Sequence, residues 1–371
     1  MKIPFYRYSF IYKLYHRKLL KIIHKTASAG KFIMQNDLIK FENEVARLTK
    51  AKYCVGVSNA TDGLQMLLMA SGIKKNDEIL MSTHTMIATA SATFFAGAKP
   101  KLLDINNKDF LIDENKLEKS ISKKTRAIIV TQLNGRIANM KKIVSIAKKN
   151  NLMIFEDSAQ ALGAKYGKKF AGTFGNGGVF SFYPAKILGC FGDGGAVITN
   201  DKKIYEKLLL LRDHGRSLVN GKVEMWGFNA RLDNIEAAIL LFLIKKLPLF
   251  IKKRREIAHI YNMQLKNLKQ LSLPPAPINY GENFDTFQNY EVMADKRDKL
   301  ADYLKSKNIG TLKQWSGNAL HDFKKLNIGK VSKNTKKIFN KLLLLPMNIS
   351  LTKKEVMYIC YNIKKYYSDS K

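Results

Sequence analysis

The stretch LMIFEDSAQALGAKYGKKFAGTFGNGGVFSFYPAKILGCFGDGGAVITN occupies residues 152–200 and contains three apolar segments that are typical of buried strands. The first segment, LMIFED, ends in two carboxylates, Glu156 and Asp157. Ligand sites in open α/β sheets gather where parallel strands end, and a buried carboxylate is costly unless a cation or a ligand pairs with it. We therefore expect a functional site next to this pair, with Asp157 the harder of the two to explain as a turn cap.

A glycine-rich turn with one lysine follows in SFYPAKILGCFGDGGAVITN, residues 181–200. A dinucleotide site needs glycines that lead from a strand into a helix, whereas these lead into AVIT, which reads as a strand. The phosphate-loop pattern GxxxxGK[ST] does not occur in the sequence. The glycines are thus expected to let the chain turn and pack closely around Lys186. From the residues alone, Lys186 could be a partly desolvated nucleophile or an ordinary surface lysine.

Outward from this stretch, short apolar segments alternate with helical ones. Expected strands are YCVGV (53–57), EIL (78–80), KPKLLDI (99–105) and AIIVTQL (127–133), and expected helices include TDGLQMLLMA (61–70) and MKKIVSIAKKN (140–150). This alternation predicts an α/β fold with a mostly parallel central sheet flanked by helices.

We expect three parts along the chain. Residues 1–31 form a basic helical segment whose apolar positions, Leu14 among them, recur near helical spacing, and which either packs on the protein or lies on a membrane surface. Residues 32–250 form the large domain. Residues 251–371 supply a linking helix and a smaller C-terminal α/β domain. One long helical region is expected from 231 to 268, followed by a linker at LPPAP, 273–277.

Composition excludes several classes of protein. Lys and Arg number 64 against 30 Asp and Glu, a formal charge of +34. The lysines are spread along the chain and no zinc-finger, helix-turn-helix or RNA-recognition pattern accompanies them, so we expect no specific nucleic acid partner.

Cys54, Cys190 and Cys360 are isolated, which predicts no metal site and fits a reducing cytoplasm. The longest apolar run, 235–244, is too short to span a bilayer.

A candidate phosphate site lies in VGVSNATDGLQMLL, residues 55–68, where small polar residues follow a strand and precede a helix. Ser58, Asn59, Ala60 and Thr61 could serve only as helix caps. The same geometry also offers free N–H groups and the positive end of a helix dipole to a phosphate. The residues alone leave both possibilities open.

Several motifs in a fixed order resemble the DegT/StrS family of sugar aminotransferases from about Phe41 to the C-terminus. They are the 155–200 part of the opening stretch, LRDHGR (211–216) and GFNARLDNIEAAIL (227–240). The resemblance implies a fold-type I enzyme that uses pyridoxal 5'-phosphate, converted to pyridoxamine 5'-phosphate during the cycle.

The resemblance also implies roles for individual residues. Lys186 matches the catalytic lysine that binds the cofactor covalently and then moves a proton between substrate and cofactor. Asp157 matches the partner of the pyridine nitrogen, and Gln160 the partner of the phenolic oxygen. The phosphate contacts implied by the family are Ala60, Thr61 and Ser181, with Asn229 reaching the phosphate of a neighbouring subunit.

Some positions depart from the family pattern. Ala60 stands where glycine is common, Met86 in THTMIAT (83–89) stands where an aromatic residue often stacks on the cofactor, and NGR (134–136) replaces a tyrosine-glycine-glutamine-like stretch. Members that dehydrate sugars have histidine in place of the lysine, so Lys186 argues against that reaction. Tyr183, Trp315 and His321 are expected on the substrate side, with a domain-core role as the alternative for Trp315.

These features together predict a homodimer with shared active sites that transfers an amino group, from glutamate, to the C3 or C4 keto group of a nucleotide-linked keto-deoxysugar. The product would enter lipopolysaccharide O-antigen or a related surface glycan. Two alternatives remain: a catalytically idle homologue that acts as a basic binding or regulatory protein, and an aminotransferase for a cyclitol or another carbonyl that is not linked to a nucleotide.

Overall fold

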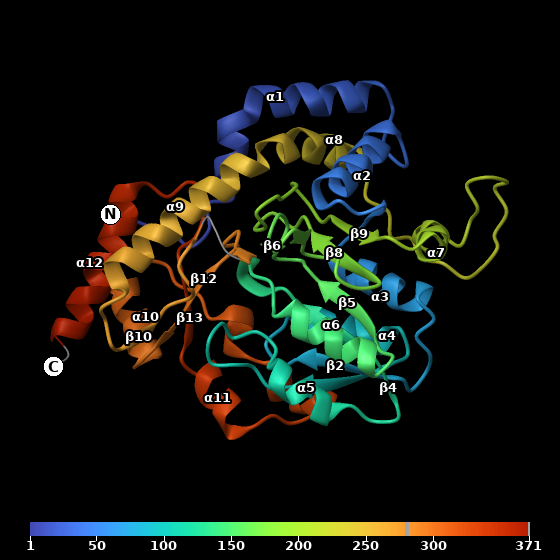
Figure 1. Cartoon of the computed structure of the whole chain (residues 1–371). Helices are drawn as coiled ribbons and strands as arrows, with labels where there is room; N and C mark the ends of the chain where they lie inside the picture. Colours follow the sequence, from blue (N-terminus) through green and yellow to red (C-terminus); the bar gives the residue numbers. More distant parts are fainter. Residues whose placement is uncertain (279–281, 370–371) are drawn as a thin grey trace.

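A seven-stranded sheet forms the centre of the computed structural model, which describes residues 1–278 and 282–369 (Figure 1). Strand β9 is antiparallel to both of its neighbours, and the remaining neighbours pair in parallel. The mostly parallel sheet predicted from the sequence is confirmed. The strands lie in the spatial order β1 (Tyr53–Val57), β9 (Gly195–Thr199), β8 (Gly177–Ser181), β5 (Met153–Asp157), β4 (Thr125–Thr131), β2 (Glu78–Ser82) and β3 (Lys99–Leu103).

Helices cover both faces of this sheet, which is why its strands read as continuous apolar runs. In β4, Ala127 and Ile129 belong to the core under one set of helices, and Ile128 and Val130 to the core on the opposite face. The first face carries α3 (Ala60–Ala70), α4 (Ile87–Phe95) and α7 (Lys202–Arg212). The opposite face carries α2 (Asn36–Thr49), α5 (Glu114–Ser120), α6 (Met140–Lys149) and α8 (Asn234–Leu243).

The C-terminal part forms a separate core around a three-stranded antiparallel sheet. The strands are β10 (Leu271–Ser272), β12 (Tyr290–Ala294) and β13 (Leu342–Leu345), and the helices are α9 (Leu247–Leu265), α10 (Arg297–Ser306), α11 (Lys333–Phe339) and α12 (Lys353–Asp369). A third small sheet joins β6 (Lys165–Tyr166) to β7 (Lys169–Phe170) and β11 (Asn283–Phe284). The domain boundaries at 31 and 250 stay predictions.

The single helical region expected from 231 to 268 is wrong in detail. The first helix of this region begins only at Asn234. Asp233 caps it, since the Asp233 carboxylate accepts a hydrogen bond from Glu236 N at 2.8 Å. A 3-10 turn at Ile244–Lys246 separates α8 from α9. Pro248 lies in the first turn of α9, a position where the missing N–H of proline breaks no helical hydrogen bond.

The N-terminal segment is only partly helical. Helix α1 (Ser9–Ser28) packs along α8 at the top of Figure 1, but the residues before it are not helical, and Ile3 pairs with Ile309 of the C-terminal part. Leu14, expected on the inner face of the helix, is 52% exposed, because Leu19 and Thr26 mark the buried side. Within residues 1–278 and 282–369, no helix is both long and apolar enough to cross a membrane.

Candidate active site

A cavity of about 700 Å³ lies at the ends of the central strands, next to the C-terminal part. Strand β5 ends at Asp157, β8 ends at Ser181 and β4 ends at Thr131, and all three residues line it. The sequence-predicted residues that the fold brings to this cavity are Ala60, Thr61, Met86, Asp157, Gln160, Ser181, Tyr183, Lys186 and Trp315.

Lys186 lies on a turn after β8 that is held from both sides. Its own N–H donates to Tyr183 O at 2.8 Å. The side-chain amide of Gln288 accepts from Ile187 N at 2.6 Å and donates to Ala185 O at 2.8 Å. Gln288 is 4% exposed and therefore fixes both neighbours of the lysine from the C-terminal part.

The amine of Lys186 is suited to act as a nucleophile. Burial lowers the pKa of Lys186 to about 8, and the nearby Asp157 carboxylate opposes that shift. An amine with this pKa is about one-tenth neutral at pH 7, against about one part in 3,000 for an ordinary lysine. The partial desolvation expected from the sequence thus has a chemical consequence.

The two carboxylates that end β5 point to opposite faces of the sheet, as successive strand residues do. Asp157 accepts hydrogen bonds from Thr89 Oγ1 at 2.6 Å and from Ala159 N at 3.2 Å, and it lines the cavity. Glu156 is fully buried on the other side, where its oxygens accept from Gly172 N, Phe174 N and Gln132 Nε2. Burial raises the pKa of Glu156 to about 7. Glu156 thus holds the backbone of the loop at Gly172 and Phe174, whereas Asp157 faces the cavity.

Helix α3 begins at the cavity. Asn59 caps it by accepting a hydrogen bond from Asp62 N at 2.9 Å, and the first N–H groups of any helix lack partners within the helix. Ala60 and Thr61 supply those groups here, beside Ser181. The cap is confirmed, and this geometry is also compatible with an anion site, so the two alternatives left by the sequence do not exclude each other.

The glycines after Lys186 do not make a left-handed turn, since none of Gly189, Gly192, Gly194 and Gly195 has positive φ, and at three of them, Gly192 excepted, a Cβ would meet other atoms at 3.0 Å or less. A Cβ on Gly195 would lie 2.5 Å from the carbonyl carbon of Asn59 and 2.8 Å from Ala60 N. Gly195 therefore lets β9 approach the start of α3.

Two predicted residues do not line the cavity. Asn229 is exposed and pairs with Asp213 in an isolated bridge. His321 lies behind the cavity wall, where its Nδ1 is 2.8 Å from Thr83 Oγ1 and burial lowers the pKa of His321. Met86 immediately precedes α4 and is 50% exposed at the cavity rim.

The sequence alone did not indicate Tyr6, Thr89, Gln288, Asn289 or Gln314, all of which line the cavity. The signal for Thr89 was a second threonine four residues before it in the quoted segment 83–89, Thr85, whose hydroxyl is 2.7 Å from that of Thr89. The other four come from the N-terminal and C-terminal parts. No local pattern marks them, since only the tertiary fold brings these segments to the lysine.

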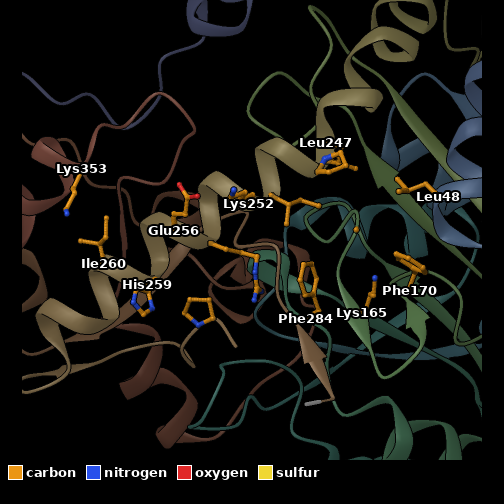
Figure 2. Close-up of a pocket in the computed structure, with 15 residues that line it drawn as sticks. Leu48, Lys165, Phe170, Leu247, Lys252, Glu256, His259, Ile260, Phe284 and Lys353 are labelled. Carbon is orange, nitrogen blue, oxygen red and sulfur yellow. The ribbon is translucent and has the colours of Figure 1, made fainter. Parts of the chain in front are cut away.

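A second cavity, of about 780 Å³, runs along α9 (Figure 2). Arg255 stacks on Phe284 with 4.2 Å between the guanidinium and the ring centre, and Lys165 lies over Phe170 at 4.9 Å. Among the described residues, its lining includes none of those predicted for catalysis or cofactor binding. It is somewhat larger than the first cavity, but its lining contains neither Lys186 nor Asp157, and no strand of the seven-stranded sheet ends at it.

Comparison with known proteins agrees with this geometry. The model of the DegT/DnrJ/EryC1/StrS aminotransferase family matches residues 15–364. The chain belongs to this family. Similar members include a GDP-perosamine synthase of Escherichia coli O157:H7, 34% identical with 90% of this chain and 91% of that protein covered. A dTDP-3-amino-3,6-dideoxy-alpha-D-galactopyranose transaminase of Aneurinibacillus thermoaerophilus is 35% identical over 84% of each chain.

Solved structures of family members share the whole fold. DesV of S. venezuelae, crystallised with a reaction intermediate, matches with a TM-score of 0.93 and 29% identity over 98% of each chain. A Bacillus subtilis protein with bound pyridoxamine phosphate matches with a TM-score of 0.88 and 26% identity, over 98% of this chain and 85% of that one. This chain is accordingly a sugar aminotransferase that depends on pyridoxal phosphate, as the sequence resemblance predicted.

The cavity fits that cofactor. It contains a lysine of lowered pKa for covalent attachment, a carboxylate that can keep a pyridine nitrogen protonated, and a helix N-terminus with small residues for a phosphate. When bound, the cofactor accepts the electron pair released when a C–H bond next to nitrogen breaks.

Proposed function

We propose that this aminotransferase moves an amino group from glutamate to the C3 or C4 keto group of a nucleotide-linked keto-deoxysugar, for a surface glycan or related glycoconjugate. The observation that carries this proposal is the lysine–carboxylate cavity in a chain whose relatives, by name, act on GDP-, dTDP- and UDP-linked sugars. The isolated cysteines fit activity in the reducing cytoplasm.

In this proposal each cavity residue has a defined role. Lys186 Nζ binds the cofactor and, once released by substrate, carries the proton between the two carbon atoms that exchange it. The carboxylate of Asp157, held by its hydrogen bond from Thr89, faces the pyridine nitrogen of the bound cofactor. Gln160 has its oxygen engaged by Asn134 N at 3.0 Å and Asn289 Nδ2 at 3.2 Å, so its NH₂ group is left to donate to the cofactor's phenolic oxygen. Ala60, Thr61 and Ser181 bind the phosphate.

We further propose that the enzyme is a homodimer with shared active sites. The loop before Asn229 exposes apolar side chains, with Val219 and Trp226 each 96% exposed and Val223 68% exposed. Exposed apolar groups of this size in one loop are typical of a protein interface. A second copy that covers this loop would bring Asn229 to the partner's phosphate site, which explains why Asn229 does not line its own cavity.

The substrate assignment can be tested with a panel of GDP-, dTDP- and UDP-linked 3-keto and 4-keto deoxysugars, plus a keto-cyclitol, each incubated with glutamate. We expect 2-oxoglutarate to form with at least one nucleotide-linked ketone, and the position of the new C–N bond identifies the carbon. Amination of the cyclitol alone would overturn the proposal in favour of a carbonyl that is not linked to a nucleotide.

The idle, regulatory alternative is not favoured. One relative, from Geobacillus stearothermophilus, is named a pleiotropic regulatory protein and is 33% identical over 84% of this chain and 83% of that protein. The lysine, the carboxylate and the amide expected for catalysis nevertheless meet in one cavity here. The lysines are spread along the whole chain, as expected of a solvated surface.

A further inference from the structure

A buried polar cluster lies behind the substrate side of the cavity. Its centre is Glu291 of β12, which is 2% exposed. Asn134 Nδ2 donates to Glu291 Oε2 at 2.8 Å, Gln314 Nε2 donates to Glu291 Oε1 at 3.2 Å, and His84 Nε2 lies 3.5 Å from the same Oε1. The carboxylate thus collects donors from three separate segments of the chain.

His84 balances the charge of Glu291. The ring of His84 is 1% exposed, and its Nδ1 is 2.9 Å from the carbonyl oxygen of Phe110, so Nδ1 must carry a proton. The other nitrogen, Nε2, lies 3.5 Å from Oε1 of Glu291 and makes no hydrogen bond within the described residues. Burial alone would lower the pKa of His84, but the nearby Glu291 carboxylate raises that pKa overall and so favours the charged imidazolium.

The cluster reaches the two sides of the cavity. On the cofactor side, Asn134 N donates to Gln160 Oε1 at 3.0 Å. On the substrate side, Gln314 Nε2 donates to Asn134 Oδ1 at 2.7 Å, and the next residue, Trp315, packs against the His84 ring with 5.4 Å between ring centres. A short chain of contacts therefore joins Gln160 to Trp315 through residues that Glu291 holds.

Three residues in these segments have a left-handed backbone. Asn134 has φ 59°, in a region that Asn adopts readily, whereas Trp315 with φ 48° and Ser316 with φ 59° are strained there. Strain of this kind costs about 1–3 kcal/mol for each residue and persists only where the surroundings impose it. Gln314, the residue before Trp315, is bonded to both Glu291 and Asn134, so the cluster is in a position to restrain this turn.

We propose that Glu291 is a positioning residue that fixes the spacing between Gln160 and Trp315, and hence the width of the cavity in which the keto-sugar must fit. This inference rests on the proposed function, in which Gln160 contacts the cofactor and Trp315 contacts the sugar. Gln is a poor substitute at position 291, because its NH₂ would face the donor NH₂ of Asn134 or that of Gln314.

The test uses the two tryptophans of the chain, Trp226 and Trp315. In a Trp226→Phe background all indole emission comes from Trp315. We expect Glu291→Gln to shift that emission, to reduce its quenching by added pyridoxal phosphate, and to raise KM for the keto-sugar more than it lowers kcat. Asp104→Asn is the matched control, since Asp104 also holds a C-terminal segment, through Ser332 N and Thr335 Oγ1, but does not line the cavity.

Asn134→Gly keeps the proposal testable if Glu291→Gln fails to fold. Glycine tolerates the left-handed backbone, so the substitution removes only the side-chain bonds. It should shift Trp315 emission in the same direction, whereas Asn151→Gly, at an exposed residue with φ 51°, should not. Unchanged emission and quenching in folded Glu291→Gln or Asn134→Gly would overturn the inference. The fluorescence readout needs no sugar, so a wrong substrate assignment would leave this result unaffected and would show only in the ketone panel.

Discussion

The hydroxyl of Thr89 donates a 2.6 Å hydrogen bond to Oδ2 of Asp157. This bond joins the first turn of α4 to the end of β5 and leaves the carboxylate with one orientation at the cavity. A carboxylate held in this way can pair with a protonated ring nitrogen without reorganising, which is how fixed charges stabilise a transition state.

Asp157→Asn should therefore lower kcat/KM by at least about 100-fold, the order expected when one preorganised electrostatic contact is lost. Thr89→Val removes the orienting bond, worth about 1 kcal/mol, together with the contact to the Thr85 hydroxyl, and should cost up to about tenfold. Steady-state kinetics with cofactor content measured by absorbance distinguishes these effects from loss of binding. Full turnover in Asp157→Asn would contradict the role given to this carboxylate.

Gly195→Ala should disturb the phosphate site without touching a reactive group. The added Cβ would meet backbone atoms of Asn59 and Ala60 at under 3 Å, and overpacking of this kind costs about 1–3 kcal/mol. We expect lower stability in urea and weaker binding of pyridoxal phosphate. Gly192→Ala is the matched control, since its nearest atom is Glu236 Oε1 at 3.4 Å, and an equal effect in both variants would rule out the specific packing argument.

Lys186 makes a prediction about pH and stability in the protein freed of cofactor. Its pKa is 10.5 in an ordinary setting and about 8 when folded, so between these values the unfolded chain binds a proton that the folded chain does not. Stability must then rise with pH across that window. The difference in unfolding free energy between wild type and Lys186→Met should grow in favour of wild type from pH 8 to 10.5. A difference that stays constant with pH would show that the amine is not desolvated.

A shared active site predicts complementation between two defective subunits. Lys186→Ala and Asn229→Asp should each be nearly inactive alone. In a mixed dimer, one site would carry both changes and the other would carry neither, so random mixing should restore about a quarter of wild-type activity. The control mixes Lys186→Ala with Asp157→Asn, two residues of the same cavity, and should restore nothing. No recovery in the first mixture would place Asn229 in its own subunit's site or outside the site altogether.

The sequence predicts the central sheet well for a physical reason. Strands such as β4 are covered on both faces, so Ala127, Ile128, Ile129 and Val130 form one apolar run. The boundary between α8 and α9, at Ile244–Lys246, was harder to predict. A proline such as Pro248 can either interrupt one helix or lie in the first turn of the next.

Much of the site was also predictable, since Asp157 and Lys186 follow strands whose ends meet at one edge of the sheet. The Glu291 cluster was not predictable. Its members come from four segments, and the left-handed backbone of Trp315 leaves no trace in composition. Such contacts depend on how the C-terminal part packs against the sheet, which no local pattern encodes.

The most direct test of the account is borohydride reduction of the purified protein with pyridoxal phosphate, followed by peptide mapping with mass spectrometry. Reduction makes the bond between cofactor and lysine permanent, and we expect the adduct on the peptide that contains Lys186, with none in Lys186→Ala. An adduct on another lysine, or a Lys186→Ala enzyme with full turnover, would contradict the central claim that Lys186 is the catalytic group.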